Sequence, residues 1–221
     1  MNREKIAFIC CVNNHAQYDT ALKCIHSLQI PEGHEIETIA IEQASSLTSG
    51  YNTGMGQSDA KYKVYHHQDT YILNEKFLFE IISLFEKYPK LGMIGMVGAK
   101  TIPNGVWWNS KLVYGAVYYT PKGKRNIGVL ANRPVAGDFE EVLAIDGLIM
   151  VTQYDLPWRE DLFKGWHFYD VSQSLEFKKA GYIVGVPKQI RPWCLHATGT
   201  MNLAGYEENR RIFVEHYKDF I

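Results

Sequence analysis

Short apolar runs alternate with helix-like segments along this chain. A continuous apolar run of about four to eight residues is typical of a strand that is buried on both faces of a parallel sheet. Runs of this kind occur at Ile6–Val12, Ile36–Ile41, Met93–Ala99, Leu148–Val151 and Tyr182–Val186. Apolar residues at helical spacing mark residues 18–28, 78–88, 171–180 and a C-terminal stretch at 206–217. Strands that alternate with helices predict an α/β fold with a mainly parallel sheet flanked by helices.

Residues that break or cap helices set the limits of these segments. Pro89 ends the second helix, because its ring is incompatible with a helix interior. Asp170 is expected to cap the N-terminus of the third helix, and Gly181 follows its last turn. Residues 102–141 are rich in Gly, Pro, Asn and aromatic residues, which predicts an insertion that carries a β-hairpin or flap. We expect one domain over residues 1–221.

The charge balance and the apolar content exclude several classes of protein. The chain has 23 Lys and Arg against 24 Asp and Glu, so the basic surface of a nucleic-acid-binding protein is not expected. No apolar run reaches the ~18–20 residues of a membrane span, and the N-terminus lacks the features of a signal peptide. The four cysteines form no C-x-x-C motif and are expected to be reduced thiols. These features predict a cytoplasmic protein with no transmembrane segment.

Polar residues follow three of the strand-like segments. Asn13-Asn14-His15 follows the first run, Glu42-Gln43 the second, and His66-His67-Gln68-Asp69 the short stretch Lys63–Tyr65. The carboxyl ends of parallel strands meet at one edge of a sheet, where ligands bind. The sequence fingerprints of dinucleotide, P-loop, α/β-hydrolase and zincin sites are absent. A carboxylate and an imidazole suit a divalent ion, so Asp69 and the distant His196 are candidate ligands, with surface or core histidines as the alternative.

The order of these segments resembles that of nucleotide-diphospho-sugar glycosyltransferases of the GT-A fold, in particular the bacterial family-2-like branch with an H-Q-D motif. His67-Gln68-Asp69 stands where that family has D-x-D, and Gly165–Asp170 resembles the segment that supplies the general base. The other matches are to the first two strands, the A-x-N-x-G helix, the strand beside the donor sugar and a late histidine: Lys5–Asn14, Ile36–Gln43, Ser49–Gly54, Ile145–Met150 and Leu195-His196. The resemblance implies a GT-A-like, Rossmann-like sheet.

The resemblance also implies a role for individual residues. It implies a UDP-sugar donor, Mn²⁺ or Mg²⁺ as cofactor, and a growing cell-surface glycan or a lipid-linked sugar as acceptor. Asp69 and His196 would hold the ion, which stabilises the charge of the diphosphate leaving group. Asp170 would take the proton of the acceptor hydroxyl, and a single base opposite the leaving group implies inversion. The nucleotide and donor sugar would contact five residues: Asn13, Glu42, Asn52, His67 and Asp146.

Each proposed carboxylate also has a structural interpretation. Asp170 could serve only as a helix cap, a role worth about 1 kcal/mol, and Asp146 could be a buried turn carboxylate. A base must be ionised, and the partial positive charge at a helix start favours an ionised Asp170.

Two departures from the family pattern leave an alternative function open. The D-x-D motif has become His67-Gln68-Asp69, and the usual Glu-Asp of the base segment is Tyr169-Asp170. Each of these two motifs keeps its final aspartate, Asp69 or Asp170. A non-catalytic nucleotide- or sugar-binding protein of the same fold is the alternative. A metal-dependent nucleotidyltransferase would need a Gly-rich, basic loop near the N-terminus, which Asn13-Asn14-His15 is not.

Large aromatic residues predict the acceptor side of the site. Trp108, from the Trp107-Trp108 pair of the insertion, and Trp166 are expected to line an acceptor pocket, with packing of the flap or the core as the alternative. The basic run Lys122–Arg125 is expected to be a solvated turn. A flap that faces phosphate or a membrane is its alternative, so peripheral attachment to the inner face of the membrane stays open.

Overall fold

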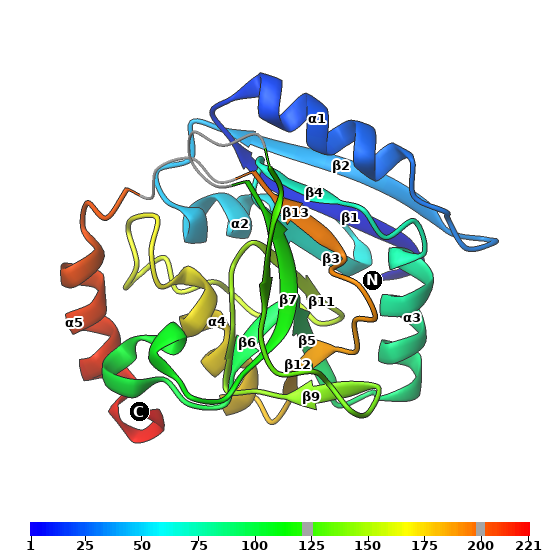
Figure 1. Ribbon diagram of the computed structural model, residues 1–221. Helices are drawn as coiled ribbons and strands as arrows, with labels where there is room; N and C mark the ends of the chain where they lie inside the picture. Colours follow the sequence, from blue (N-terminus) through cyan, green and yellow to red (C-terminus); the bar gives the residue numbers. More distant parts are fainter. Residues whose placement is uncertain (121–125, 198–201) are drawn as a thin grey trace.

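A seven-stranded sheet forms the centre of the molecule (Figure 1). The computed structural model describes residues 1–120, 126–197 and 202–221. The sheet has the order β2-β1-β3-β11-β5-β12-β9, with bounds Glu35–Glu42, Asn2–Val12, Ala60–His66, Ile149–Thr152, Leu91–Gly95, Ile183–Pro187 and Phe139–Glu141, respectively. β2, β1, β3, β5 and β12 share one direction, and β11 and β9 run antiparallel to their neighbours. The predicted α/β fold with a mainly parallel sheet is therefore confirmed.

One strand differs from its prediction in direction. Leu148–Val151 is predicted as a strand of the parallel set, but β11 pairs antiparallel with both β3 and β5. All four residues of β11 are buried, and a fully buried strand has the same apolar pattern in either direction. Apolar periodicity therefore could not reveal the reversal.

A second sheet lies beside the first and carries part of the chain between residues 102 and 141. Its order is β10-β6-β7-β13-β4, with bounds Ala144–Ile145, Val97–Ala99, Val113–Tyr119, Cys194–His196 and Thr70–Ile72, and β8 (Gly128–Ala131) pairs antiparallel with β7. The predicted run Met93–Ala99 is divided between β5 and β6, which belong to different sheets. Two short 3₁₀ helices, Pro103–Gly105 and Trp107–Asn109, precede β7. The run Lys122–Arg125 lies outside the described residues.

Five α-helices flank the sheets in the described part of the chain. They are α1 (His15–His26), α2 (Leu47–Gly56), α3 (Phe77–Lys87), α4 (Tyr169–Lys179) and α5 (Tyr206–His216), followed by the 3₁₀ turn Lys218–Phe220. The helices predicted by apolar spacing are all present. The N-cap of α4 is Phe168, in a left-handed conformation with φ 64°, so Asp170 lies in the first helical turn and the prediction that it caps the helix is wrong. Gly181 follows α4 with φ +83°, as a helix-ending glycine requires.

Alternate residues of β1 face different layers, as the two-residue period of a strand requires. Ile6 and Phe8 pack in the cluster that contains the apolar faces of α1 and α3. Ala7 and Ile9 pack in the cluster that contains Tyr51 of α2. Both faces of the apolar part of this strand are therefore covered, and polar residues follow at its carboxyl end.

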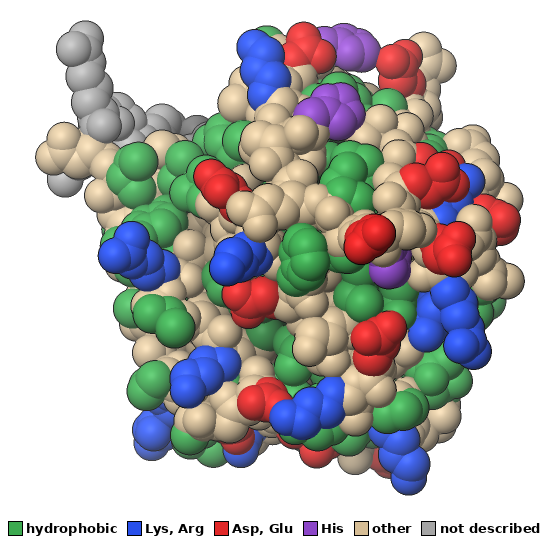
Figure 2. All heavy atoms as spheres, turned by 90° about the vertical axis from the view of Figure 1, so that its right-hand side faces the viewer, with side chains coloured by type: hydrophobic (Ala, Val, Ile, Leu, Met, Phe, Trp, Pro, Cys, Tyr) green, Lys and Arg blue, Asp and Glu red, His purple; other side chains and the backbone are tan. Residues whose placement is uncertain are grey.

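The molecular surface has mixed charge. Basic and acidic side chains are interspersed on the face shown in Figure 2, in keeping with the formal net charge of -1. Among the described residues, no helix has the length and apolar character needed to cross a bilayer. All four cysteines are free thiols, and Cys10 and Cys194 are buried.

Candidate functional site

The carboxyl ends of β1, β2 and β3 meet at one edge of the central sheet. Val12 pairs with Glu42 at the ends of β1 and β2, and β3 ends at His66. A cleft of about 180 Å³ opens at this edge. Its lining comes from the ends of β1 and β3, from α2 and from the segment before α4: Cys11, Asn13, Leu47, His66, His67, Gln68, Asp69 and Trp166. The polar residues that follow β1 and β3 therefore converge on the cleft, whereas Glu42 at the end of β2 does not line it.

A larger groove lies elsewhere on the molecule. It has a volume of about 1230 Å³ and runs between α3 and residues 187–193. Its charged groups have both signs, among them Glu80, Lys87 and Arg191. The residues that the sequence singles out for chemistry lie at the smaller cleft instead, so the cleft is the candidate site.

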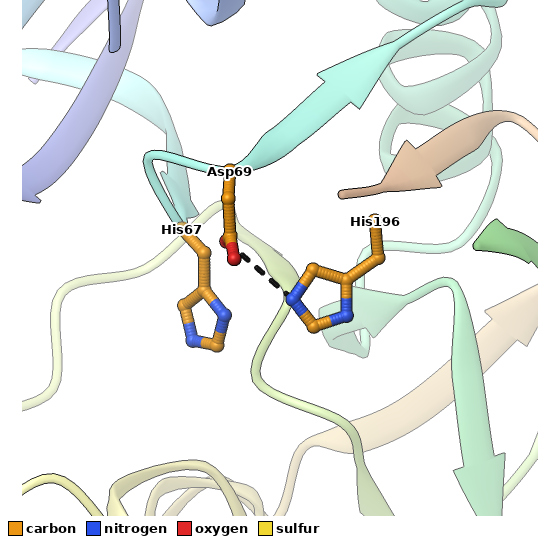
Figure 3. A group of neighbouring side chains, drawn as sticks. All are labelled: His67, Asp69 and His196. Carbon is orange, nitrogen blue, oxygen red and sulfur yellow. Dashed lines mark ion pairs between the residues drawn. The ribbon is translucent and has the colours of Figure 1, made fainter. Parts of the chain in front are cut away.

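Three side chains at the cleft form a group that fits a metal ion (Figure 3). One potential ligand atom from each of His67, Asp69 and His196 lies within 4.8 Å of the other two. Asp69 Oδ1 is 3.4 Å from His196 Nε2. Two ligands of one divalent ion are separated by roughly 4–5 Å at most, given bonds of about 2.0–2.3 Å. Two imidazoles and one carboxylate, with room for further ligands, are a donor set that divalent ions accept.

Backbone pairing between β4 and β13 brings Asp69 and His196 together. His196 is the register partner of Thr70, the residue after Asp69. The Ala197 N–H also donates to the carbonyl of Asp69 at 2.8 Å. The sequence prediction that Asp69 and His196 meet in space is confirmed. The pairing of β4 with β13 sets the distance between Asp69 and His196, and this distance cannot be predicted from the sequence around either residue.

Electrostatics within this group favour an Asp69–His196 ion pair beside a neutral His67. Burial opposes the charged form of both partners, but their contact holds the pKa of Asp69 below, and the pKa of His196 above, its usual value. Burial, assisted by the nearby His196, lowers the pKa of His67 to about 4. A neutral imidazole keeps a lone pair, which a metal ligand needs. His67, predicted to contact the donor, thus lies with the two predicted metal ligands.

The other histidine of the motif has a different environment. His66 is 2% exposed, and its ring packs edge-on against Phe8 in the core. Its Nδ1 lies 3.0 Å from the carbonyl oxygen of His67. Consecutive residues at a strand end point to opposite sides, so His66 and His67 do not act together.

Gln68, the middle residue of the motif, fastens the loop that follows β1. Its Oε1 accepts hydrogen bonds from the backbone N–H groups of Asn13 and Asn14, at 2.9 and 2.8 Å. Its Nε2 donates to Asn13 Oδ1 at 2.6 Å. No separate role for Gln68 is predicted from the sequence. Its position directly after a strand end, between two candidate ligands, was the available signal.

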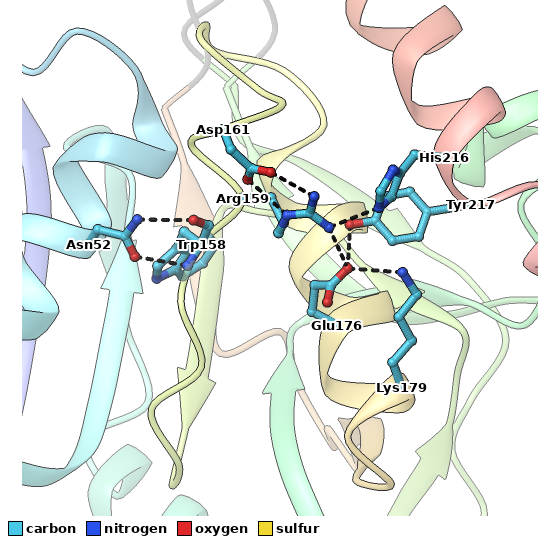
Figure 4. A network of polar contacts seen from close by, with 8 residues as sticks. All are labelled: Asn52, Trp158, Arg159, Asp161, Glu176, Lys179, His216 and Tyr217. Carbon is cyan, nitrogen blue, oxygen red and sulfur yellow. Dashed lines mark hydrogen bonds and ion pairs between the residues drawn. The ribbon is translucent and has the colours of Figure 1, made fainter.

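Three of the five residues predicted to contact the nucleotide and donor sugar, Asn13, Glu42 and Asn52, have separate environments in the structure. Asn13 borders the cleft, although its amide oxygen is engaged by Gln68. Glu42 lies at the end of β2 with an exposed side chain, and its Oε1 is 3.8 Å from His15 Nε2. Asn52 of α2 exchanges two hydrogen bonds with the backbone of Trp158, at 2.8 and 3.0 Å (Figure 4). Asn52 therefore anchors the segment after β11 and does not line the cleft.

Two part-buried carboxylates, Asp146 and Asp170, interact electrostatically with each other next to His67, whose backbone N–H donates to the carbonyl of Leu148 at 3.1 Å. The Gly147 N–H donates to Asp170 Oδ2 at 3.1 Å, and the Leu148 N–H donates to Asp146 Oδ1 at 2.9 Å. Burial, with the charge of Asp146 as the second cause, raises the pKa of Asp170 to about 7. Burial also raises the pKa of Asp146, against the opposing influence of His196. The backbone N–H groups at the helix start do favour the ionised form of Asp170, as expected from the sequence, but desolvation outweighs them and the pKa of Asp170 is raised.

The aromatic residues predicted for the acceptor side occupy two positions. Trp166 is 48% exposed and lines the cleft. Trp108, 49% exposed, lies outside the cleft and packs against Trp107 and Tyr206, with ring centroids 5.7 Å away in each case. Tyr206 in turn contacts His167 and Phe168, whose ring centroids are 5.3 and 5.1 Å away. Trp108 thus reaches the segment before α4 only through Tyr206.

With this geometry in view, similarity to known proteins identifies the family. A family model described as "Glycosyltransferase like family" matches residues 7–217. The chain belongs to this glycosyltransferase-like family. Among curated proteins, none matches the sequence.

Solved structures with this fold include several GT-A glycosyltransferases. The mannosyltransferase PcManGT from Pyrobaculum calidifontis, in complex with GDP-Man and Mn²⁺, has a TM-score of 0.61 and 11% identity over 99% of this chain and 64% of its own. S. aureus TarS 1-349 in complex with UDP has a TM-score of 0.58 and 11% identity, over 96% of this chain and 64% of its own. A mutant Drosophila β1,4-galactosyltransferase 7, in complex with manganese, UDP-Gal and xylobiose, has a TM-score of 0.54 and 15% identity, over 94% of this chain and 79% of its own.

These similarities define the fold of this glycosyltransferase-like chain. The identities of 11–15% are too low to carry residue roles across. The chain spans just under two thirds of the length of the first two structures. The fold class predicted from the sequence, a GT-A-like α/β fold, is confirmed by them.

Proposed function

We propose that this protein transfers a sugar from a nucleotide-diphospho-sugar, a UDP-sugar by preference, to a glycan or a lipid-linked acceptor, with inversion. One observation carries the proposal: the His67–Asp69–His196 group lies next to a part-buried pair of carboxylates, Asp146 and Asp170. The backbone N–H of His67 donates to the Leu148 carbonyl, and the Leu148 N–H in turn donates to Asp146. The first set suits an ion that binds a diphosphate, and the second offers a base. Complexes of structural relatives with UDP or GDP-Man support a nucleotide-sugar donor.

The donor occupies the cleft in this proposal. Asn13, held by Gln68, and Glu42 form the part nearest the nucleotide, and Asp146 faces the donor sugar. Asn52 supports this site from α2 through Trp158. His67 lies between the donor and the metal site.

Asp69, His196 and His67 hold Mn²⁺ or Mg²⁺ in this proposal. When bound, such an ion stabilises the negative charge that develops on the departing diphosphate. Mn²⁺ in the complexes of two relatives supports a metal requirement. The charged imidazole of the Asp69–His196 pair must lose its proton to become a ligand, so ion binding at this site should release protons.

Asp170 is the proposed general base. The acceptor hydroxyl is a weak nucleophile, and a carboxylate within reach removes its proton as attack proceeds. A pKa of about 7 suits this role, because a base is most effective when its pKa lies near the working pH. Trp166 lines the cleft and offers the acceptor a stacking surface, and Trp108 extends this wall through Tyr206. Direct attack with one base gives inversion at the sugar carbon.

We also propose that residues 1–221 act as a single glycosyltransferase-like domain, in which residues 102–141 contribute the β7–β8 pair as a flap. A cytoplasmic location, where nucleotide sugars are available, is consistent with the free thiols. Attachment to the inner face of the membrane would bring a lipid-linked acceptor within reach.

Donor turnover separates an enzyme from a binding protein. UDP-sugars and GDP-mannose should be supplied with Mn²⁺, and release of UDP or GDP measured with and without candidate acceptors. We expect turnover of a UDP-sugar that falls by about 10²–10⁴ in Asp170→Asn, while the affinity for UDP stays within about twofold of wild type. Asp69→Ala should weaken UDP binding only when Mn²⁺ is present.

The alternative is a non-catalytic nucleotide- or sugar-binding protein. It predicts UDP binding without turnover for every donor, and equal behaviour of wild type and Asp170→Asn. Preferred turnover of GDP-mannose would instead correct the choice of nucleotide.

A further inference from the structure

The two departures from the glycosyltransferase motif pattern contact each other. His67 replaces the first aspartate of D-x-D, and Tyr169 replaces the glutamate that usually precedes the base. His67 Nε2 and the Tyr169 hydroxyl form a hydrogen bond, and their ring centroids are 6.0 Å apart. Tyr169 is 5% exposed and lies in the first turn of α4. The two unusual residues thus form one structural unit.

This contact determines which nitrogen of His67 faces the metal-binding group. Because Nε2 is engaged by Tyr169, the other ring nitrogen, Nδ1, is left on the side of Asp69 and His196 (Figure 3). With the proton on Nε2 and donated to the tyrosine oxygen, Nδ1 keeps its lone pair. A metal-binding histidine commonly donates its second N–H in this way, which fixes both its tautomer and its orientation.

The surroundings hold the Tyr169 ring in place. It packs against Tyr51 and Trp158, with ring centroids 6.0 and 6.5 Å away. Its hydroxyl also lies over Gly147, where a β-carbon would come within 2.1 Å of the hydroxyl oxygen. Glycine at position 147 leaves the space that the hydroxyl needs to reach His67.

We propose that His67 is the third metal ligand, that Tyr169 is the residue that positions it, and that this His-Asp-His set selects a first-row transition ion such as Mn²⁺ over Mg²⁺. The inference rests on the proposed metal site of the glycosyltransferase and deepens it. Mg²⁺ takes oxygen ligands almost exclusively, whereas transition ions accept imidazole nitrogen readily. A set of ligands that contains two imidazoles therefore penalises Mg²⁺ most. In the general order of affinities of divalent first-row transition ions, Co²⁺ binds a given site more tightly than Mn²⁺.

Metal binding without any nucleotide or sugar tests this directly. Free Mn²⁺ is counted by electron paramagnetic resonance during titration, Mg²⁺ is tested by competition against Mn²⁺, and Co²⁺ by its visible absorption. For the wild-type protein we expect affinities in the order Co²⁺, Mn²⁺, Mg²⁺, with Mg²⁺ at least about tenfold weaker than Mn²⁺. His67→Asp, which restores the carboxylate of the usual motif, should narrow the Mn²⁺/Mg²⁺ ratio and change the Co²⁺ spectrum as a nitrogen ligand is replaced by oxygen.

Tyr169→Phe isolates the positioning role, since it removes only the hydroxyl and keeps the packed ring. We expect Mn²⁺ affinity to fall about tenfold, the lower end of the usual effect of such a partner, with an unchanged melting temperature. Tyr154→Phe is the matched control. Its hydroxyl donates to the carbonyl of Pro89 at 2.8 Å, away from the cleft, so Mn²⁺ affinity should not change.

The readouts do not depend on sugar transfer, so a protein that never turns over a donor can still show the expected ion order. An equal preference for Mn²⁺ and Mg²⁺ in the wild-type protein would overturn the proposed selectivity. A Co²⁺ spectrum that is the same in wild type and His67→Asp would exclude His67 as a ligand. Unchanged Mn²⁺ affinity in Tyr169→Phe would leave Tyr169 with a packing role only.

Discussion

At the residue scale, the chemistry of the cleft depends on how each ionisable side chain is surrounded. Asp69 and Asp170 are both aspartates at the end of a short motif, yet their pKa values shift in opposite directions. His196 provides Asp69 with an opposite charge, whereas burial and the like charge of Asp146 act on Asp170. Asp69 is therefore suited to remain ionised beside a metal ion, whereas Asp170 is suited to exchange a proton near neutral pH.

This difference predicts the pH dependence of transfer. A base must be unprotonated to act, so kcat/KM should rise with pH through an apparent pKa near 7, the value for Asp170. Asp146→Asn removes the like charge and should move this rise to lower pH, even if the overall rate falls. The pH profile of kcat/KM for both proteins provides the measurement.

Asp138→Asn serves as the control for that profile. Asp138 pairs with Lys87 on the surface at 2.6 Å, far from the cleft, and its replacement should leave the profile unchanged. A profile that stays flat from about pH 5 to 9 in the wild-type protein would contradict the role of Asp170 as the titrating base.

At the scale of elements, the site is assembled by contacts between loops that follow different strands. The side chain of Gln68 makes three hydrogen bonds to the loop between β1 and α1. That loop continues into α1, whose N-cap is Asn14. These hydrogen bonds therefore hold the turn that contains His67 and Asp69 against the loop at Asn13 and Asn14.

Gln68→Ala should loosen that arrangement without removing a ligand. We expect UDP binding, measured by calorimetry without metal, to weaken about fivefold to tenfold, since a lost hydrogen bond is worth about 1 kcal/mol. Gln29→Ala is the control, because the Gln29 amide bonds Glu75 at the surface at 3.4 Å. Equal UDP affinity in Gln68→Ala and wild type would show that the loop keeps its conformation without the glutamine.

At the scale of the whole molecule, a polar network joins the C-terminal helix to the elements beneath it (Figure 4). Glu176 of α4 accepts hydrogen bonds from the Tyr217 hydroxyl at 2.7 Å and from Arg159 at 3.2 Å. Arg159 also lies 2.9 Å from His216 Nε2. Burial and the positive charge of Arg159 lower the pKa of His216, so its neutral ring accepts this hydrogen bond. The helix α5, which begins at Tyr206, is thus anchored at its carboxyl end.

Removing the Tyr217 hydroxyl should loosen that anchor. Tyr217 is 1% exposed, and a hydrogen bond to a charged group is worth about 1.5–3 kcal/mol. We expect Tyr217→Phe to lower the free energy of unfolding by about 1–2 kcal/mol in urea titrations. Tyr88→Phe is the matched control. Its hydroxyl also donates to a carboxylate, that of Asp138, at 2.8 Å, but this hydrogen bond is exposed and water can replace it. Equal losses in the two variants would contradict a special role for the α5 anchor.

The layout of the fold follows from the sequence alone. Buried strands and amphipathic helices have different apolar periods, so the α/β class and the helices at residues 78–88 and 206–217 follow from local pattern alone. The order of motifs also selected the two aspartates and the late histidine. These features are local because periodicity and residue type do not depend on distant parts of the chain.

The directions of the strands, the distances between side chains and the environment of each ionisable group depend on the tertiary structure. The antiparallel course of β11 and the pairing of β4 with β13 are choices between strands far apart in the sequence. Folding also brings His67 close to Asp69 and His196. It places the Asn52 amide in hydrogen bonds with the backbone of Trp158. The pKa of Asp170 likewise depends on burial and on Asp146, which come from the packing of separate segments. Sequence shows which groups are available, but their reactivity follows from neighbours that only folding supplies.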